Sequence, residues 1–249
     1  MYNFRTDMAL ERRDIYKKTN SLEEIDGIES QKENVDENIN IERVFITNEN
    51  GETAVGKPKG NYVTIDIKNL KIAREEEIQK ASDTLTRELG KILDKHVTRK
   101  EEVLIVGLGN IYVTPDSLGP KVINEIDITR HLIKYMPQYI DENTRNVCAI
   151  APGVLGTTGM ETLEILKGIV DNVKPKLIIV IDSLASRSIE RISSSLQIAD
   201  TGIVPGAGVE NARAELSKET LGIPVIAIRY SNCCGACNTC FWWDWYIYR

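Results

Sequence analysis

The chain has 249 residues, of which 42% are hydrophobic, and a formal net charge of −6. This length and apolar content suit one good-sized core, so we expect one domain with excursions rather than two equal domains. The acidic balance argues against a nucleic-acid binder, because such proteins usually neutralise phosphates with a basic face. We expect no membrane span and a cytoplasmic location, because no apolar run approaches bilayer length and the N-terminus lacks an apolar signal region.

The first hundred residues predict a small β excursion followed by one helix. Residues 1–50 are largely polar, with an apolar strand-like segment at 41–46. Turn signals at Asn50-Gly51 and at Gly56–Gly60 bracket short alternating segments, of which 62–67 is the clearest. From Arg74 to about His96 apolar residues recur at three- and four-residue steps, which predicts an amphipathic helix packed on the sheet.

Four apolar runs predict the central sheet. They cover Val103–Leu108, Asn146–Ile150, Leu177–Ile181 and Val225–Ile228. The segments between them are long enough for crossover helices, so the pattern favours an α/β fold with a mainly parallel sheet and helices on both faces.

Two aspartates follow strands of this sheet. Asp116 stands where the loop after the first run would turn into a helix, and Asp182 comes directly off the end of the third run. Ligands of open α/β sheets bind beyond the carboxyl ends of the strands, so both carboxylates are expected to point at one place. A lone aspartate in such a position more often caps a helix or turn.

A nucleotide-binding α/β oxidoreductase is the alternative function. Gly107-Leu108-Gly109 after a strand is similar to a dinucleotide-binding turn, but Tyr112 stands where the third glycine of that motif would fall. No acidic residue closes the next strand at the expected distance.

The end of the chain is unusual in composition. Cys148 is most simply a small core residue, whereas the other four cysteines and all three tryptophans lie after residue 232. The spacing Cys234-x-x-Cys237-x-x-Cys240 suits a metal or an iron-sulfur cluster. We favour a frame slip after about Ile228 instead, because the codons of 229–240, shifted by one nucleotide, can be read as a sensible continuation of the preceding strand.

Several spaced motifs together resemble the germination protease family of spore-forming bacteria. They are Gly107–Asn110 with Thr114–Pro120, Ala151–Val154 with Thr158–Glu161, Ile181–Arg187, and Asp200–Ile203 with Pro205-Gly206 and Gly208-Val209. The resemblance extends from Arg5 to about Ile228, and the family is similar in fold to the hydrogenase-maturation endopeptidases. Family members cleave small acid-soluble spore proteins during germination, are made as self-processing zymogens and assemble as tetramers.

The resemblance implies a site and a domain plan. Asp116 and Asp182 match the carboxylates proposed for catalysis, and the segment 5–11 is similar to the family's self-cleavage segment, with the scissile bond between Asp7 and Met8. Residues 1–7 would be the propeptide, 8–228 an incomplete α/β peptidase domain and 229–249 an aberrant Cys- and Trp-rich tail. Without the resemblance, the first residues would be interpreted as a frayed terminus.

Two chemistries fit the aspartate pair. Two carboxylates that share a site cannot both ionise without a large penalty, so one can hold a proton while the other activates water. The pair could also hold a metal, although zinc would normally want nitrogen or sulfur ligands as well, and we favour the metal-free mechanism without a cofactor. Because the family chain normally runs further, we expect this chain to be poorly soluble or inactive.

Overall fold

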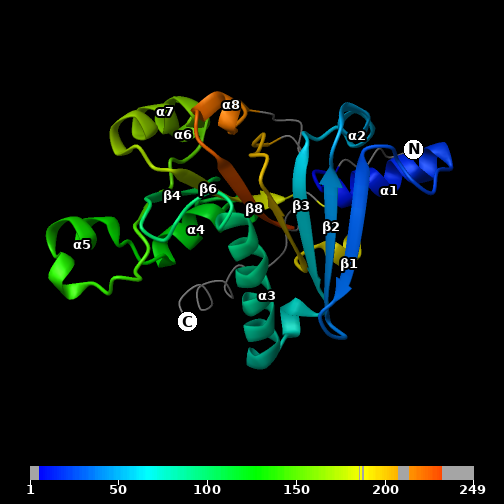
Figure 1. Cartoon of the computed structure of the whole chain (residues 1–249), viewed down its shortest axis with the longest axis horizontal. Coiled ribbons are helices and arrows are strands. Elements are labelled where there is room, and N and C mark those ends of the chain that lie inside the picture. The colour runs from blue at the N-terminus through cyan, green and yellow to red at the C-terminus, as the bar shows by residue number, and fades with distance from the viewer. Residues whose placement is uncertain (1–5, 185, 187, 207–212, 232–249) are drawn as a thin grey trace.

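The computed structural model describes residues 6–184, 186, 188–206 and 213–231. Within these residues one eight-stranded sheet has the order β1-β2-β3-β7-β8-β6-β4-β5 (Figure 1). Its strands are β1 (Ile28–Asn34), β2 (Ile39–Ile46), β3 (Gly60–Ile67), β4 (Val103–Gly107), β5 (Val147–Ile150), β6 (Leu177–Leu184), β7 (Ser195–Ala199) and β8 (Val225–Ser231).

Helices of varied length connect these strands. The α-helices are α1 (Ala9–Asn20), α2 (Glu49–Val55), α3 (Glu75–Leu93), α4 (Leu118–Glu125), α5 (Arg130–Tyr135), α6 (Leu155–Thr158), α7 (Thr162–Val173) and α8 (Lys218–Leu221). Short 3₁₀ turns are η1 (Leu70–Ile72), η2 (Thr114–Asp116), η3 (Pro137–Tyr139) and η4 (Ile189–Arg191). No helix among the described residues combines the length and apolar character that a membrane crossing requires.

Four strands form the predicted parallel half of the sheet. β4 pairs in parallel with β5 and β6, and β6 pairs in parallel with β8. These strands correspond to the four apolar runs, which confirms the α/β class and the parallel pairing of these runs. The side chains of β4, β6 and β8 are mostly buried on both faces, as strands covered by helices on two sides require, whereas those of the edge strand β5 are only partly buried.

The sheet as a whole is mixed, so the prediction of a mainly parallel sheet was wrong. β1, β2 and β3 pair antiparallel, β3 pairs antiparallel with β7, and β7 pairs antiparallel with β8. β7 is only five residues long and alternates between apolar and polar side chains, so no apolar run marks it. This strand joins the N-terminal β excursion to the parallel half, and the excursion is therefore the other half of one sheet (Figure 1).

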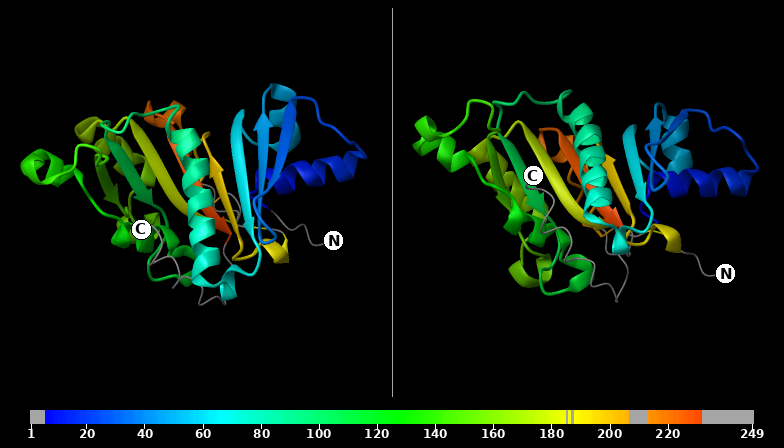
Figure 2. Two further views of the ribbon diagram at one scale, coloured as in Figure 1. Left: turned by 60° about the horizontal axis from the view of Figure 1, so that its bottom comes forward. Right: turned by 90° about the horizontal axis from the view of Figure 1, so that it is seen from below.

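Helices cover both faces of the sheet. On one face, α3 and α4 pack over apolar side chains of β3, β4, β6, β7 and β8 (Figure 2). On the opposite face, α7 and α8 cover β4, β6 and β8, while α1 packs over β2 and β3. Between these last two clusters the sheet presents polar side chains rather than apolar ones, and this polar strip is where the candidate site lies.

Two local features differ from what the sequence led us to expect. The residues after the predicted cleavage bond form the helix α1, whose first residues Ala9 and Leu10 are fully buried, and no helix was predicted there. Asn50-Gly51 lies in α2 rather than in a turn, because the Asn48 side chain accepts the Gly51 amide at 2.9 Å and caps the helix. The Gly56 turn signal is accurate, since Gly56 ends α2 in the left-handed conformation.

Candidate active site

A row of buried polar residues crosses one face of the sheet. In register, Asp182 of β6 pairs with Arg229 of β8, Arg229 pairs with Gln197 of β7, and Gln197 pairs with Thr64 of β3. Paired residues of neighbouring strands point to the same face, so these side chains lie side by side. All four are buried. The N-terminal segment supplies a hydrogen-bond partner for Arg229, whereas Oγ1 of Thr64 and Nε2 of Gln197 are buried without one among the described residues.

Arg229 is the centre of this row. Its Nη2 donates to Oδ2 of Asp7 at 2.8 Å, and its Nε lies 3.7 Å from Oδ2 of Asp182. The side chains of Arg229, Asp7 and Asp182 are 7%, 2% and 10% exposed. One buried guanidinium therefore lies between a predicted catalytic carboxylate and a predicted cleavage-site carboxylate.

Sequence reasoning missed Arg229 because it assigned residues from 229 onward to the aberrant tail. β8 continues through Ser231, and the alternation of the strand places Arg229 on the same face as Ala227. This alternation was the available signal. The Cys-rich segment itself lies outside the described residues.

Asp116 lies in η2, which follows β4 and lies against β6. Its Oδ2 accepts the amide of Asn110 at 2.8 Å, so the carboxylate stabilises the loop rather than capping α4, whose N-cap is Ser117. Gly109 makes the loop possible: its φ is +116°, and a Cβ there would collide with the backbone oxygen of Asp116.

Burial shifts the acidity of both aspartates. It raises the pKa of Asp182 to about 6, against the opposing effect of the Arg229 charge, and the charges of Asp116 and Asp7 also raise it. Burial likewise raises the pKa of Asp116, although its hydrogen bond from Asn110 opposes the rise. The two carboxylates that the sequence singled out therefore share one electrostatic environment.

The predicted cleavage segment occupies this site. Asp7 is 2% exposed and Met8 is fully buried, with Met8 extended at φ −77° and ψ 125° immediately before α1. Its amide donates to Oγ1 of Thr6 at 3.1 Å. The structure thus brings Asp7 and Asp182 together through Arg229 and places the Asp7–Met8 bond in the buried interior.

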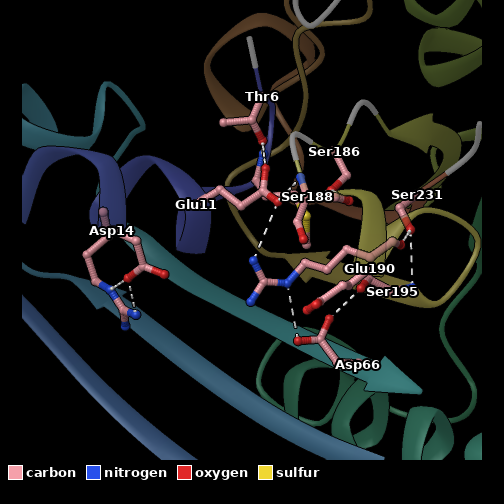
Figure 3. Close-up of polar contacts among 12 residues, drawn as sticks. Thr6, Glu11, Asp14, Asp66, Ser186, Ser188, Glu190, Ser195 and Ser231 are labelled. Atoms are coloured by element: carbon pink, nitrogen blue, oxygen red, sulfur yellow. Dashed lines mark hydrogen bonds and ion pairs between the residues drawn. The ribbon is translucent and has the colours of Figure 1, made fainter. Parts of the chain in front are cut away.

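Glu11 fixes the other end of the segment. Its Oε1 accepts the Ser186 hydroxyl and the Ser188 amide, each at 3.0 Å, and lies 3.4 Å from Nη1 of Arg191 (Figure 3). Its other oxygen accepts the Thr6 hydroxyl. The acidic residue at each end of the segment therefore contacts groups outside α1.

Lys57 is a second cation near the site that the sequence did not single out. Burial lowers its pKa to about 8, and the charge of Arg229 lowers it further, while Asp7 raises it. The neighbouring Gly56 carbonyl accepts Nη1 of Arg12 at 3.0 Å, which ties this turn to α1. A titratable lysine near neutrality is thus part of the charge balance around Asp7.

The described residues contain no group of three or more His, Cys, Asp or Glu side chains arranged to hold a metal ion. The aspartate pair by itself offers two carboxylates. Cys148 is partly buried and donates towards Glu102 and the Val103 carbonyl, away from Asp116 and Asp182.

Comparison with known proteins gives one consistent result. The family model for germination protease matches residues 5–239. The germination protease of Clostridium acetobutylicum is 49% identical over 230 residues, which cover 92% of this chain and 69% of that protein. Those of Clostridium perfringens and Caldanaerobacter subterraneus are 48% and 49% identical, and the matches cover 69% and 67% of their lengths. With a match from residue 5 to residue 239, the chain belongs to the germination protease family.

Proposed function

We propose that this chain is a peptidase of spore germination that cuts its own Asp7–Met8 bond and small acid-soluble spore proteins, with Asp116 and Asp182 as the catalytic pair. The observation that carries the proposal is the buried contact of Asp7 with Arg229, which also lies 3.7 Å from Asp182. The family match supports the peptidase class and gives no support to the nucleotide-binding alternative.

The pair divides the chemistry of hydrolysis. Asp182, the more buried carboxylate, carries a proton below its pKa of about 6, and the more exposed Asp116 is ionised. Asp116 takes a proton from water as the water oxygen bonds to the Asp7 carbonyl carbon. Asp182 gives its proton to the Met8 nitrogen as the peptide bond breaks. A proton then passes from Asp116 to Asp182, and the starting state returns.

The position of the N-terminal segment supports the proposal that the uncut chain is a zymogen. Asp7 contacts Arg229 beside Asp182, and Glu11 contacts Ser186, so a foreign peptide cannot make the same contacts until this segment moves. We propose that residues 1–7 are a propeptide, that residues 8–228 together with the rest of β8 to Ser231 belong to the peptidase domain, and that the working enzyme is a homotetramer in the spore core. No metal is required by this mechanism.

Two isosteric substitutions test the catalytic pair. Asp116→Asn and Asp182→Asn should each stop removal of residues 1–7, because neither amide can exchange a proton as a carboxyl group does. Intact mass and N-terminal sequencing of the purified chain report whether Met8 becomes the first residue. Asp171→Asn, at an exposed position of α7, is the matched control and should process normally.

Continued processing in either site variant would contradict the assignment of that aspartate. The same measurement on the unaltered chain, together with a thermal melt, tests the expectation that this chain is poorly soluble or inactive. A chain that melts cooperatively and releases residues 1–7 is folded and active. If the unaltered chain neither melts cooperatively nor releases residues 1–7, the two substitutions should be made in a chimeric chain that carries the C-terminal part of the Clostridium perfringens relative.

A further inference from the structure

The backbone around the Asp7–Met8 bond is held by hydrogen bonds on both sides. The Met8 amide, whose nitrogen would leave when the bond breaks, donates to Oγ1 of Thr6 at 3.1 Å. The carbonyl of Thr6, in the preceding peptide unit, accepts Nε of Arg12 at 3.0 Å. The carbonyl of Met8, in the following peptide unit, accepts the backbone amide of Arg12 at 3.1 Å. One residue therefore binds the peptide units on both sides of this bond.

The Thr6 hydroxyl can act only as an acceptor toward the Met8 amide. It donates its own proton to Oε2 of Glu11 (Figure 3), and a hydroxyl has one proton to donate. The hydroxyl is therefore not a proton source for the Met8 nitrogen. It fixes instead the direction in which the Met8 N–H points, and both residues are buried there.

Arg12 is anchored to a second element of the fold. Its Nη1 donates to the carbonyls of Gly56 at 3.0 Å and Val55 at 3.4 Å, at the end of α2. Gly56 permits this close approach, because its φ is +65° and a Cβ there would lie 2.9 Å from Nη1. The rigid fork of the guanidinium binds these carbonyls and that of Thr6 at once. The position of the Thr6 carbonyl is thus set by α2 as well as by α1.

Hydrolysis changes the geometry of the Met8 nitrogen. In the intact peptide bond this nitrogen is planar, because its lone pair is delocalised into the Asp7 carbonyl. When the water oxygen bonds to the carbonyl carbon, the nitrogen becomes pyramidal, and it takes a proton on its lone pair as the bond to carbon breaks. A nitrogen whose hydrogen is already held presents this lone pair in one direction. Such prior orientation lowers the barrier, because less freedom is lost during the reaction.

We propose that the Thr6 hydroxyl and the Arg12 guanidinium are positioning groups for self-cleavage, which hold the Met8 N–H and the Thr6 carbonyl so that the Met8 nitrogen faces its proton donor. The inference rests on the proposed function, in which Asp182 supplies that proton. Thr6 lies in the piece that is released, so its hydroxyl acts once, in the chain that carries it. Variants at this position yield the same product enzyme and report on the cut alone.

The hydrogen bond of the Met8 amide can be measured without cleavage. The full chain carries Asp116→Asn to keep it uncut and is labelled with ¹⁵N at its four methionines, and Met8→Leu identifies the Met8 signal. Thr6→Val removes the hydroxyl and keeps the shape of the side chain. We expect it to accelerate solvent exchange of the Met8 amide about tenfold. The amides of Met136 and Met160, which have partners elsewhere, are the internal controls.

The second measurement is the first-order rate at which residues 1–7 are released, followed by intact mass. Thr6→Val should slow release about tenfold to a hundredfold, whereas Thr6→Ser keeps the hydroxyl and should retain most of the rate. Arg12→Gln should slow release by a similar factor, and Arg12→Lys should not restore it, because an ammonium group lacks the planar fork. Lys18→Gln, at an exposed position of α1, is the matched control and should process normally.

Two results would overturn the proposal: unchanged exchange of the Met8 amide in Thr6→Val, or release by Thr6→Val as fast as by Thr6→Ser. A packing role for the Thr6 side chain predicts the opposite order, because valine keeps the volume that serine loses. A thermal melt shows that each variant is folded, and if the Arg12 variants do not fold, the Thr6 pair decides.

The rates are measured in the chimeric chain if the unaltered chain does not release residues 1–7. Release that persists in Asp182→Asn, while Thr6→Ser still exceeds Thr6→Val, would count against the proposed catalytic pair alone.

Discussion

Burial destabilises the ionised form of Asp182, so the contribution of this residue to the free energy of unfolding depends on pH. Its pKa is raised from 3.8 to about 6 by burial, with Arg229 opposing. The folded protein therefore binds this proton more tightly than the unfolded chain does. The resulting stability is present below the unfolded pKa and is lost as pH rises through the folded value, a loss of about 3 kcal/mol at most.

Asp182→Asn should for this reason stabilise the fold at pH 8 and have little effect at pH 4. We expect a gain of roughly 1–2 kcal/mol at the higher pH, because the amide removes a buried charge but also removes a partner of Arg229. Thermal melts of the variant and the unaltered chain across this range measure the difference. A gain that is equal at both pH values, or a loss at pH 8 alone, would contradict the shifted acidity.

At the scale of elements, α3 is joined to β2 by a buried ion cluster. Glu88 of α3 accepts Nε and Nη2 of Arg43, each at 2.8 Å, and Nζ of Lys91 at 2.7 Å. These partners hold the pKa of Glu88 at about 2 against the opposing effect of its burial. The folded pKa is depressed, so the stabilisation is present above the unfolded value of 4.5 and is lost as pH falls through about 2.

Glu88→Ala should cost about 3 kcal/mol, because it leaves Arg43 partly buried without its main partner. Urea unfolding at pH 7 measures this loss. Glu76→Ala, at an exposed position in the first turn of the same helix, is the control and should change stability by less than about 0.5 kcal/mol. Equal effects of the two substitutions would show that the cluster does not anchor α3.

The elements with one dominant period could be predicted from sequence, and the others could not. The apolar runs of β4, β6 and β8 and the helical stripe of α3 are visible because both faces, or one whole face, are apolar. β7 was hidden because Gln197 and Ser195 face the polar strip, so the strand carries no continuous apolar run. The two candidate aspartates stand out in the sequence because they follow strong strands, whereas Arg229 and Lys57 lie where no motif marked them.

For the whole molecule, β7 is the seam between two differently built halves. It pairs with β3 on one side and with β8 on the other, and Ile198 is fully buried between them in the cluster that α3 covers. The antiparallel and parallel halves therefore share one core. The two halves are expected to unfold together, because β7 cannot keep its pairing and packing when either half is unfolded.

Ile198→Ala should lower the free energy of unfolding by about 2–5 kcal/mol, the range for truncation of a fully buried isoleucine. The transition should remain single when it is followed both by circular dichroism and by tyrosine fluorescence. Two separate transitions would show that the halves are independent domains. Ile72→Ala, on a side chain that is 79% exposed, is the control and should leave the midpoint nearly unchanged.

Met8 is fully buried and begins a helix that packs into the core, and this has a consequence for what happens after the proposed cut. Only the short piece ending at Asp7 can diffuse away; the other product is the enzyme itself. A product tethered next to its own site acts as an inhibitor at a local concentration of about millimolar. Cleavage would thus leave the new amino terminus as a competitive inhibitor of the enzyme. Incoming spore proteins would have to displace it from the site at every turnover.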